Sequence, residues 1–279
     1  MANLTMQEES DHFSPYRADG KLYGFVCVVT GADQPIGRAI VAELAAHGAA
    51  SIYACTSSPN ATDIPTSDTA QIIHYPHLEP NEHSTLALID EALNGFGRLD
   101  VWVCASTTPG PKTMASTTPA DLDAAFEHNT LAPFFALKYA PAAMEKMTKK
   151  GLYGNAAPKD SRYGSIIVVT STACEKAAGY GPAFTISCHA ALGVVRSGVS
   201  ALKGTGVRIN AISHSGIDMS GEVKPTNGNG TVPVGGGKGG LDRVGNPSEV
   251  GRVAGFLASG FSSYITGANI KVDGGESVL

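Results

Sequence analysis

Two residues in the second half of the chain have the types and the spacing of a proton-transfer site. Ser171 ends an apolar run, and Tyr180 follows shortly before a helical pattern that begins at Ala183. Ser171 could hydrogen-bond a substrate, and the phenol of Tyr180 could donate a proton to it. The alternatives are an aromatic pocket wall for Tyr180 and an ordinary strand-end serine for Ser171.

A glycine-containing loop near the start of the chain has the chemistry of a phosphate site. The segment Thr30-Gly31-Ala32-Asp33-Gln34-Pro35-Ile36-Gly37 lies between an apolar run and a helical pattern. Backbone N–H groups at such a junction bind a dinucleotide pyrophosphate, although an ordinary strand–helix turn has the same outline. Gly31 permits the tight turn and Gly37 lets the helix approach the sheet. Pro35 stands where such loops usually have another glycine, and it has no N–H to donate.

The elements that must position these residues follow from an alternation of apolar runs and helical patterns. Strands apolar throughout and separated by helices indicate a parallel sheet buried on both faces. The expected fold is therefore α/β, a doubly wound Rossmann-type sheet. Strands are predicted at 25–29, 51–55, 71–75, 99–104, 165–170, 207–212 and 269–272, and helices at 36–47, 81–94, 121–149 with a kink near Pro133 or Pro141, 183–202 and 247–259.

The length of 279 residues and the 43% hydrophobic content fit a single domain with a large core. We predict a polar N-terminal tail at 1–22 and one domain at 23–279, with a Gly-rich lid at about 214–242. The net charge of −5, without a Lys/Arg run, argues against nucleic acid or an anionic membrane as the main partner. We expect no membrane span, no metal site and, from five scattered cysteines, a cytoplasmic protein.

Several further segments between about Gly24 and Gly275 form a pattern together with the glycine loop Thr30-Gly31 to Gly37. They are Gly97-Arg98-Leu99-Asp100, Asn129, Ser171, Val207-Arg208-Ile209-Asn210-Ala211, Asn246-Pro247-Ser248-Glu249 and Val272-Asp273-Gly274-Gly275. In these segments the chain resembles the short-chain dehydrogenase/reductase family. The resemblance implies a nicotinamide dinucleotide cofactor, a small-molecule substrate, and a homodimer or homotetramer formed through the helices at Asp121 and Ala183.

The chain departs from this family at its catalytic residues. Asn129 and Ser171 match the family tetrad, but Phe184 and Cys188 occupy the positions of its Tyr and Lys. Phe184 has no titratable proton, and the Cys188 thiol is too short to replace a Lys. Carbonyl reduction would lose an acid/base contribution of roughly 10²–10⁴-fold.

Three functions remain open. The first is an atypical NADP(H)-dependent enzyme of natural-product biosynthesis, acting on a bulky apolar molecule. It would reduce a pre-activated electrophile such as an iminium or template a cyclisation, as do fungal family members that reduce an iminium and guide a Diels–Alder reaction. The second is a non-catalytic binding or scaffold protein. The third is a conventional carbonyl reductase in which Tyr180 replaces the missing Tyr.

We expect NADP rather than NAD, because the end of the second strand carries hydroxyls and no carboxylate. An Asp or Glu there would bind the adenosine ribose and repel a 2′-phosphate. The residues expected to bind the cofactor come from the glycine loop, the second strand end, the fourth strand and the sixth strand: Gly31, Asp33, Gln34, Ile36, Gly37, Thr56, Ser57, Ser58, Cys104, Ser106, His214 and Ile217.

Overall fold

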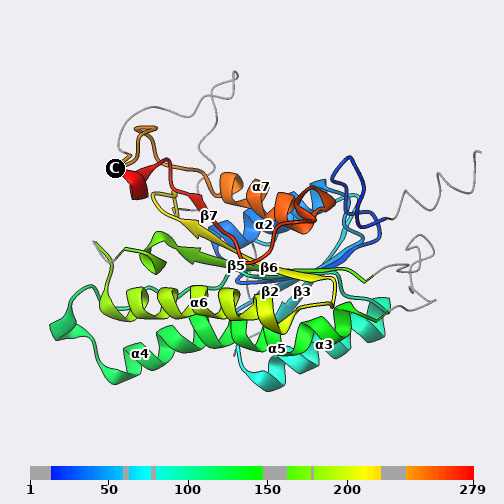
Figure 1. Ribbon diagram of the computed structural model, residues 1–279, viewed down its shortest axis with the longest axis horizontal. Helices are drawn as coiled ribbons and strands as arrows, with labels where there is room; N and C mark the ends of the chain where they lie inside the picture. Colours follow the sequence, from blue (N-terminus) through cyan, green and yellow to red (C-terminus); the bar gives the residue numbers. More distant parts are fainter. Residues whose placement is uncertain (1–13, 59–62, 77–79, 147–161, 177–178, 221–236) are drawn as a thin grey trace, which may run out of the picture.

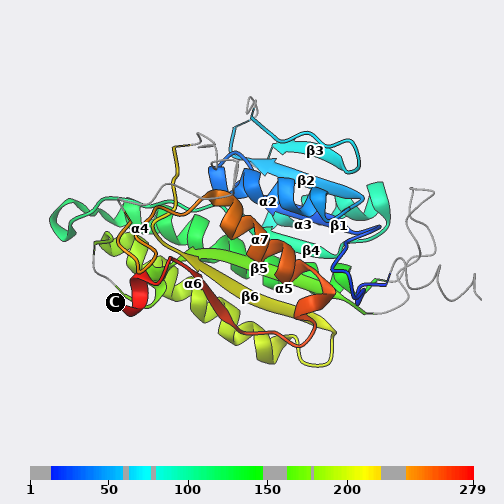
Figure 2. The ribbon, with the colours of Figure 1, turned by 90° about the horizontal axis from the view of Figure 1, so that it is seen from above.

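The computed structural model describes residues 14–58, 63–76, 80–146, 162–176, 179–220 and 237–279. Seven strands form one sheet in the order β3-β2-β1-β4-β5-β6-β7, and every neighbouring pair is parallel (Figures 1 and 2). This confirms the α/β, doubly wound prediction. The strands are β1 Val26–Thr30, β2 Ser51–Thr56, β3 Gln71–Pro76, β4 Val101–Cys104, β5 Gly164–Ser171, β6 Val207–His214 and β7 Asn269–Val272.

Helices cover both faces of the sheet. Figure 1 shows α2 and α7 on one side, and α3, α4, α5 and α6 on the other. Alternate residues of the central strands supply the two cores, since side chains along a strand point to opposite faces: Val26 and Val28 belong to one, Cys27 and Val29 to the other. The helices are α2 Pro35–Ala46, α3 Glu82–Phe96, α4 Pro119–Phe126, α5 Ala132–Met144, α6 Pro182–Ala201 and α7 Pro247–Ala258.

Side-chain caps explain where several helices begin. The Asn81 side chain accepts from the N–H of Ser84, and the Ser84 hydroxyl accepts from the N–H of Asn81. Thr118 and Asn246 form the same reciprocal box at the starts of α4 and α7. Each box satisfies N–H groups that the helix itself leaves unpaired. At the other end of α3, Gly97 adopts a left-handed conformation, with φ 69°.

The helix predicted at 121–149 is interrupted. A π-helical turn at Glu127–Leu131 separates α4 from α5. Pro133 has no N–H to donate to the carbonyl of Asn129, so the regular ladder cannot continue through this turn. Pro141 lies within α5 without ending it. The end of the predicted helix and residues 221–236 of the predicted lid lie outside the described residues.

The last residues of the predicted polar tail pack against the domain. Leu22 is 0% exposed, and its N–H donates to the carbonyl of His47 at 2.8 Å. Tyr16 makes an edge contact with Tyr163, with ring centroids 5.8 Å apart. The folded unit therefore begins before residue 23. Burial of the Leu22 side chain helps to hold this segment on the domain.

None of the helices in the described part of the chain is long and apolar enough to cross a membrane. The described residues also contain no group of three or more His, Cys, Asp or Glu arranged to hold a metal ion. All five cysteines are buried as free thiols.

A buried ion pair joins the starts of β1 and β4. Asp100 is 0% exposed and accepts from Nε and Nη2 of Arg98, both at 2.8 Å. The same carboxylate accepts from the N–H of Val26 at 2.9 Å. Asp100 therefore links the two central strands directly.

We expect Asp100→Ala to lower the free energy of unfolding by about 3–5 kcal/mol, because Arg98 would stay buried with its charge uncompensated. Urea unfolding monitored by circular dichroism measures this loss. The exposed carboxylate of Asp68 provides the control, and Asp68→Ala should change stability by less than about 0.5 kcal/mol. A loss below about 1 kcal/mol for Asp100→Ala would show that the pair does not hold these strands together.

Candidate active site

Two glycines bring the loop after β1 into unusually close contact with its surroundings. A Cβ on Gly37 would lie 2.0 Å from the carbonyl oxygen of Gly31. A Cβ on Gly31, whose φ is +69°, would lie 2.6 Å from the backbone nitrogen of Ser106. Any larger side chain would push the start of α2 away from the sheet. The two glycines thus form a shallow cradle at the carboxyl edge of β1 and β4, where the strand order reverses.

The N-terminus of α2 lies in this cradle without a side-chain cap. Gln34 is the N-cap residue, but its side chain makes no capping hydrogen bond and instead donates to the carbonyl of Thr107 at 3.3 Å. Pro35 has no N–H. The first-turn N–H groups of Ile36 and Gly37 are those that the helix cannot satisfy internally, and they suit a phosphate oxygen. The cradle therefore fits a dinucleotide, as the sequence predicts.

The adenosine side differs from the expectation. The hydroxyl of Thr56 donates to the carbonyl of Ser58 at 2.8 Å and lies 2.8 Å from Nε2 of His74. Ser57 donates its N–H, at 3.1 Å, and its hydroxyl to the Asp33 carboxylate. The hydroxyls of Thr56 and Ser57, which the sequence places toward a 2′-phosphate, thus have partners within the protein. A carboxylate also lies at the end of β2, and it comes from the glycine loop and not from the strand.

Cys104 and Ser106, both expected to bind the cofactor, have different surroundings. Cys104 is 3% exposed and belongs to the core, where burial raises the pKa of its thiol to about 12. Its side chain is therefore a neutral core group and not part of the site. Ser106 lies directly against Gly31 and is partly exposed at the edge of the cradle.

Several predicted site residues surround one pocket at the carboxyl ends of β5 and β6. The pocket has a volume of about 270 Å³. It brings together residues far apart in sequence, among them five of the predicted site residues. Its lining includes Lys112, Ser171, Tyr180, Phe184, His214, Ser215 and Ile217.

Tyr180 presents its phenol to this pocket from the segment between β5 and α6. Its hydroxyl is 2.8 Å from the Ser215 hydroxyl and 3.0 Å from the Thr172 hydroxyl. Ser171, also on the pocket wall, accepts from the N–H of Ala173 at 3.2 Å. The two residues identified from sequence as candidates for proton transfer therefore line one pocket.

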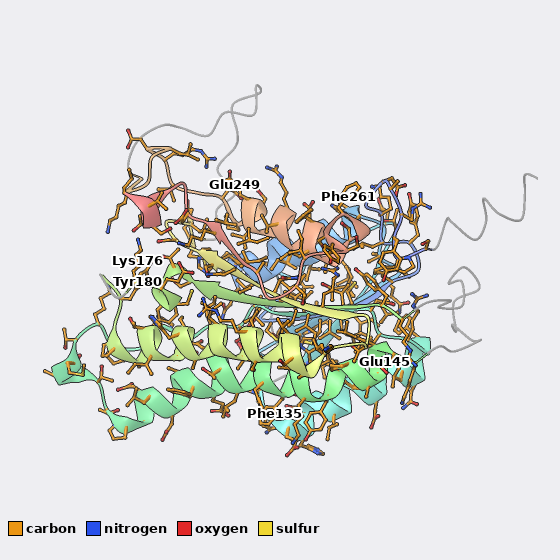
Figure 3. The ribbon with its side chains drawn as sticks, in the orientation of Figure 1. Phe135, Glu145, Lys176, Tyr180, Glu249 and Phe261 are labelled. Carbon is orange, nitrogen blue, oxygen red and sulfur yellow. The ribbon has the colours of Figure 1, made fainter. Side chains whose placement is uncertain are left out.

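The hydrogen bonds continue from Tyr180 to residues that sequence reasoning missed. The Ser215 hydroxyl donates to Oε2 of Glu276 at 2.6 Å, and Oε1 of Glu276 lies 3.5 Å from Nζ of Lys176. Figure 3 shows Lys176 and Tyr180 at the same end of the molecule, just ahead of α6. Glu276 follows the last strand by only a few residues, and nothing in its spacing from Tyr180 could have indicated the contact.

Phe184 and Cys188, one turn apart on α6, lie in different surroundings. The Phe184 ring lines the pocket, with its centroid 5.8 Å from that of Tyr180. Cys188 is 0% exposed and packs in the core, where burial raises the pKa of its thiol. Phe184 is therefore an apolar wall, and Cys188, predicted to stand at the Lys position of the site, does not reach the pocket.

The side chain of Asn129 forms three hydrogen bonds within the protein. Its Oδ1 accepts from the N–H of Thr108 at 2.8 Å, and its Nδ2 donates to the carbonyl of Thr108 at 3.0 Å and to the Ser187 hydroxyl at 2.8 Å. With these three bonds it ties the loop after β4 to α6. Cys188 stands on α6 one helical turn after Phe184. The helix therefore offers no Lys ammonium at that position to extend these hydrogen bonds.

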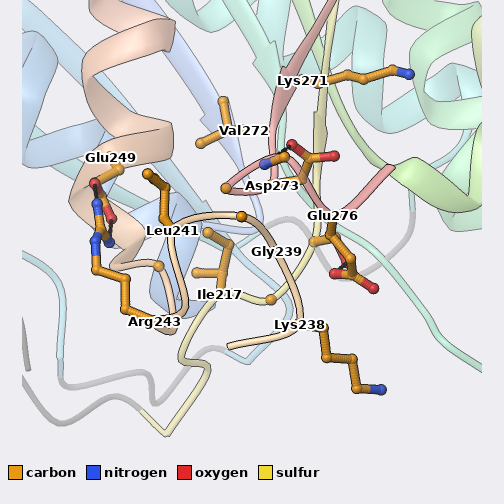
Figure 4. Close-up of a pocket in the computed structure, with 16 residues that line it drawn as sticks. Ile217, Lys238, Gly239, Leu241, Arg243, Glu249, Lys271, Val272, Asp273 and Glu276 are labelled. Atoms are coloured by element: carbon orange, nitrogen blue, oxygen red, sulfur yellow. Dashed lines mark hydrogen bonds and ion pairs between the residues drawn. The ribbon is translucent and has the colours of Figure 1, made fainter. Parts of the chain in front are cut away.

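A second cavity of about 480 Å³ adjoins the first, and the two share Ser215, Gly216 and Ile217 (Figure 4). Its walls come from the segment after β6, the start of α7 and the C-terminal residues. Arg243 closes one side through an ion pair with Glu249, with Nη2 and Oε1 2.6 Å apart. Several charged side chains line this cavity, in contrast to the aromatic wall at Phe184: Lys238, Arg243, Glu249, Lys271, Asp273 and Glu276.

The comparisons with known proteins agree with this geometry. Residues 31–277 match a family model described as Enoyl-(Acyl carrier protein) reductase. The chain is 27% identical to momilactone A synthase of Oryza sativa subsp. japonica, over 93% of this chain and 92% of that protein. It is 28% identical to (+)-borneol dehydrogenase 1 of Salvia officinalis, over 93% and 96%.

A solved structure shows the same fold. The short-chain dehydrogenase/reductase from Serratia marcescens BCRC 10948 superposes with a TM-score of 0.73 and 21% identity, over 92% of this chain and 99% of that one. The family match, the strand order and the glycine cradle lead to one conclusion. The chain belongs to the short-chain dehydrogenase/reductase family.

Proposed function

We propose that the protein is a nicotinamide-dependent oxidoreductase of secondary metabolism that acts on an apolar alcohol or ketone, with Tyr180 as its proton-transfer residue. The observation that carries the proposal is the Tyr180 hydroxyl on the pocket wall, held 2.8 Å from Ser215. The relatives named for momilactone A and borneol support the substrate class.

The cofactor would be held mainly by backbone groups. The cradle at Gly31 and Gly37 and the first turn of α2 suit its pyrophosphate. His214 and Ile217 line the pocket and would border its nicotinamide, and Ser106 lies beside Gly31 at the edge of the cradle. When bound, the cofactor supplies or accepts the hydride.

Tyr180 would exchange a proton with the substrate oxygen. In ketone reduction its hydroxyl would give its proton to the substrate oxygen. In alcohol oxidation the phenol oxygen would take the substrate proton as its own proton passes to Ser215, whose hydroxyl proton passes to the Glu276 carboxylate. Ser215 and the Glu276 carboxylate then connect the phenol to the protein surface, because Lys176 and Glu276 retain 27% and 19% side-chain exposure. The chain thereby replaces the usual Tyr–Lys pair with groups from outside α6.

The walls of the pocket favour an apolar substrate. Phe184, Ile217 and the ring of Tyr180 face a space of about 270 Å³. The hydroxyl of Ser171 is the polar group placed to orient a substrate oxygen beside Tyr180. This arrangement suits a compact cyclic molecule that carries a single oxygen function.

A second candidate function is the reduction of a pre-activated electrophile such as an iminium, or a templated cyclisation, with NADP(H). Phe184 and Cys188 favour it, because neither can move a proton at the family's usual position. Such reactions need orientation and hydride but no proton transfer to oxygen. The two candidates differ in whether Tyr180 is required.

His214 does not supply the missing positive charge. It ends β6 on the pocket wall, and burial lowers its pKa to about 4. At neutral pH it is therefore an uncharged hydrogen-bonding group. The same shift makes the free energy of unfolding depend on pH. As the pH falls below about 6.5, His214 gains a proton in the unfolded state before it does so in the folded state, and the folded state loses stability.

We also propose a homo-oligomer formed through α4, α5 and α6. Leu131 and Phe134, one helical turn apart, are 41% and 43% exposed, and Ile186 on α6 is 45% exposed. Apolar side chains gathered on one helical layer are typical of an interface between subunits. The partner would be a second copy of this chain.

Tyr180→Phe should reduce the oxidation of a cyclic alcohol such as borneol by roughly 10²–10⁴-fold, because it removes the proton acceptor. The assay follows reduced cofactor by absorbance, and calorimetry checks that cofactor affinity is unchanged. Tyr264→Phe is the matched control, since Tyr264 is fully exposed at 103%. Unchanged turnover in Tyr180→Phe would favour the iminium or cyclisation candidate. Failure to bind any nicotinamide cofactor would instead indicate the non-catalytic alternative.

The stability of the protein should fall by about 1–2 kcal/mol between pH 7 and pH 5, as His214 protonates in the unfolded state near 6.5 but in the folded state only near 4. Urea midpoints at several pH values measure the change. His214→Gln should flatten this dependence, and His189→Gln, which alters an exposed histidine, should not. Identical slopes for the wild type and His214→Gln would contradict the assignment.

Phe134→Asp should shift the protein toward the monomer, because it places a charge in the proposed interface. Size-exclusion chromatography with light scattering reports the mass. Leu86→Asp is the control, since Leu86 is similarly exposed at 40% but lies on α3. A wild-type protein that is monomeric at micromolar concentration would rule out the interface.

A further inference from the structure

We infer that Asn269, on β7, is a positioning residue that holds the Tyr180 phenol in place by joining the two segments that carry the hydrogen-bond partners of this phenol. The inference rests on the proposed function, because it concerns the proton-transfer residue of that same pocket. The described residues that line the pocket do not include Asn269. Its effect on the phenol is therefore indirect.

The Tyr180 hydroxyl lies between two hydroxyls that follow different strands. It is 3.0 Å from the hydroxyl of Thr172, which follows β5, and 2.8 Å from that of Ser215, which follows β6. Strands β5 and β6 are paired as far as Ser171 and His214. Each partner of the phenol thus lies one residue beyond the ladder, where the pairing of these two strands no longer sets the distance between them.

The side chain of Asn269 connects the two segments. Its Oδ1 accepts from the hydroxyl of Ser213 at 2.5 Å, and its Nδ2 donates to Oε1 of Glu175 at 2.9 Å. Ser213 lies two residues before Ser215, and Glu175 lies three residues after Thr172. One amide group therefore joins the short segments from which the phenol receives its two hydrogen-bond partners.

Part of this connection is buried. Ser213 is 0% exposed and Cys174 is 2% exposed. The Cys174 thiol lies 3.1 Å from the Ser213 hydroxyl and 3.6 Å from Nδ2 of Asn269. A buried hydroxyl that loses its partner carries the cost of its desolvation, so separation of the two segments is unfavourable.

An amide is the side-chain group that meets both requirements of this position. Lys271, also on β7, forms an ion pair with Glu175 at 2.7 Å, and hydrogen bonds from Lys271 and Asn269 lower the pKa of the Glu175 carboxyl. Glu175 is therefore a carboxylate that only accepts hydrogen bonds, whereas the Ser213 hydroxyl needs an acceptor. Asparagine supplies a donor and an acceptor. An aspartate would place a second carboxylate beside Glu175.

The NMR signal of the Tyr180 ring, in full-length protein labelled with ¹³C-tyrosine, tests the inference without a substrate. The spectrum of Tyr180→Phe assigns the signal. We expect Asn269→Asp to shift it, and Asn269→Asp combined with Glu175→Gln to restore it, because the glutamine amide can donate to the aspartate. Asn210→Asp is the matched control and should leave the signal unchanged. Asn210 is a fully buried asparagine of β6 whose amide donates to the carbonyl of Ile265 at 2.9 Å.

The activity of the same variants gives a second measurement. Asn269→Asp should lower kcat for the oxidation of borneol by about 10- to 100-fold, because a displaced phenol no longer meets the substrate oxygen in the right geometry. The affinity for the cofactor should stay the same. In the Tyr180→Phe background the substitution should have almost no further effect on kcat, because residues that act as a unit are not additive. Glu175→Ala, a change at a partly exposed side chain, should also lower kcat and shift the Tyr180 signal.

Three results would overturn the inference. They are an unchanged Tyr180 signal in Asn269→Asp and Glu175→Ala, an equal shift in Asn210→Asp, and a full additional loss of kcat in the Tyr180→Phe background. Circular dichroism checks folding, and Glu175→Ala decides the test if Asn269→Asp does not fold. Full activity of Tyr180→Phe would instead overturn the proposed function, and the ring signal would still report whether Asn269 positions the phenol.

Discussion

The whole site depends on one close backbone contact. Helix α2 can begin where it does only because residues 31 and 37 carry no side chain; a Cβ on Gly37 would lie 2.0 Å from the Gly31 carbonyl oxygen. This contact seats the uncapped end of α2 against the carboxyl edge of β1. The same loop then carries Asp33 to β2 and meets the segment after β4 at Ser106. The glycine cradle and the Asp33 carboxylate are therefore parts of one turn.

The pocket, unlike the glycine loop, is formed by segments that lie far apart in the sequence. Its proton-carrying groups come from three separate segments: Tyr180 precedes α6, Ser215 follows β6 and Glu276 follows β7. Parallel strands bring their carboxyl ends to one edge, so residues distant in sequence meet there. A phenol held by two hydroxyls and linked to a carboxylate is better positioned for proton transfer than a free side chain. The loss of the usual pair at Phe184 and Cys188 need not remove acid/base chemistry from the fold.

The same arrangement relates the two ends of the cofactor site to each other. At the end of β2 the Asp33 carboxylate accepts both hydrogen bonds from Ser57. At the pocket end His214 is uncharged and Phe184 is apolar. The described side chains of the pocket therefore include an uncharged imidazole and an apolar ring at the end of β6 and the start of α6.

The sequence by itself determined the α/β architecture, the place of the glycine loop and the absence of a Tyr–Lys pair on α6, because hydrophobic periodicity and local spacing carry that information. It also identified Ser171, Tyr180, Phe184 and His214, which the fold gathers around one pocket. Only the tertiary structure showed that Cys104 and Cys188 are core thiols, that Asp33 reaches Ser57, and that Ser215 and Glu276 extend the hydrogen bonds of Tyr180. These contacts depend on which strand ends and loops meet at the edge of the sheet, and that information lies in the packing of segments far apart along the chain.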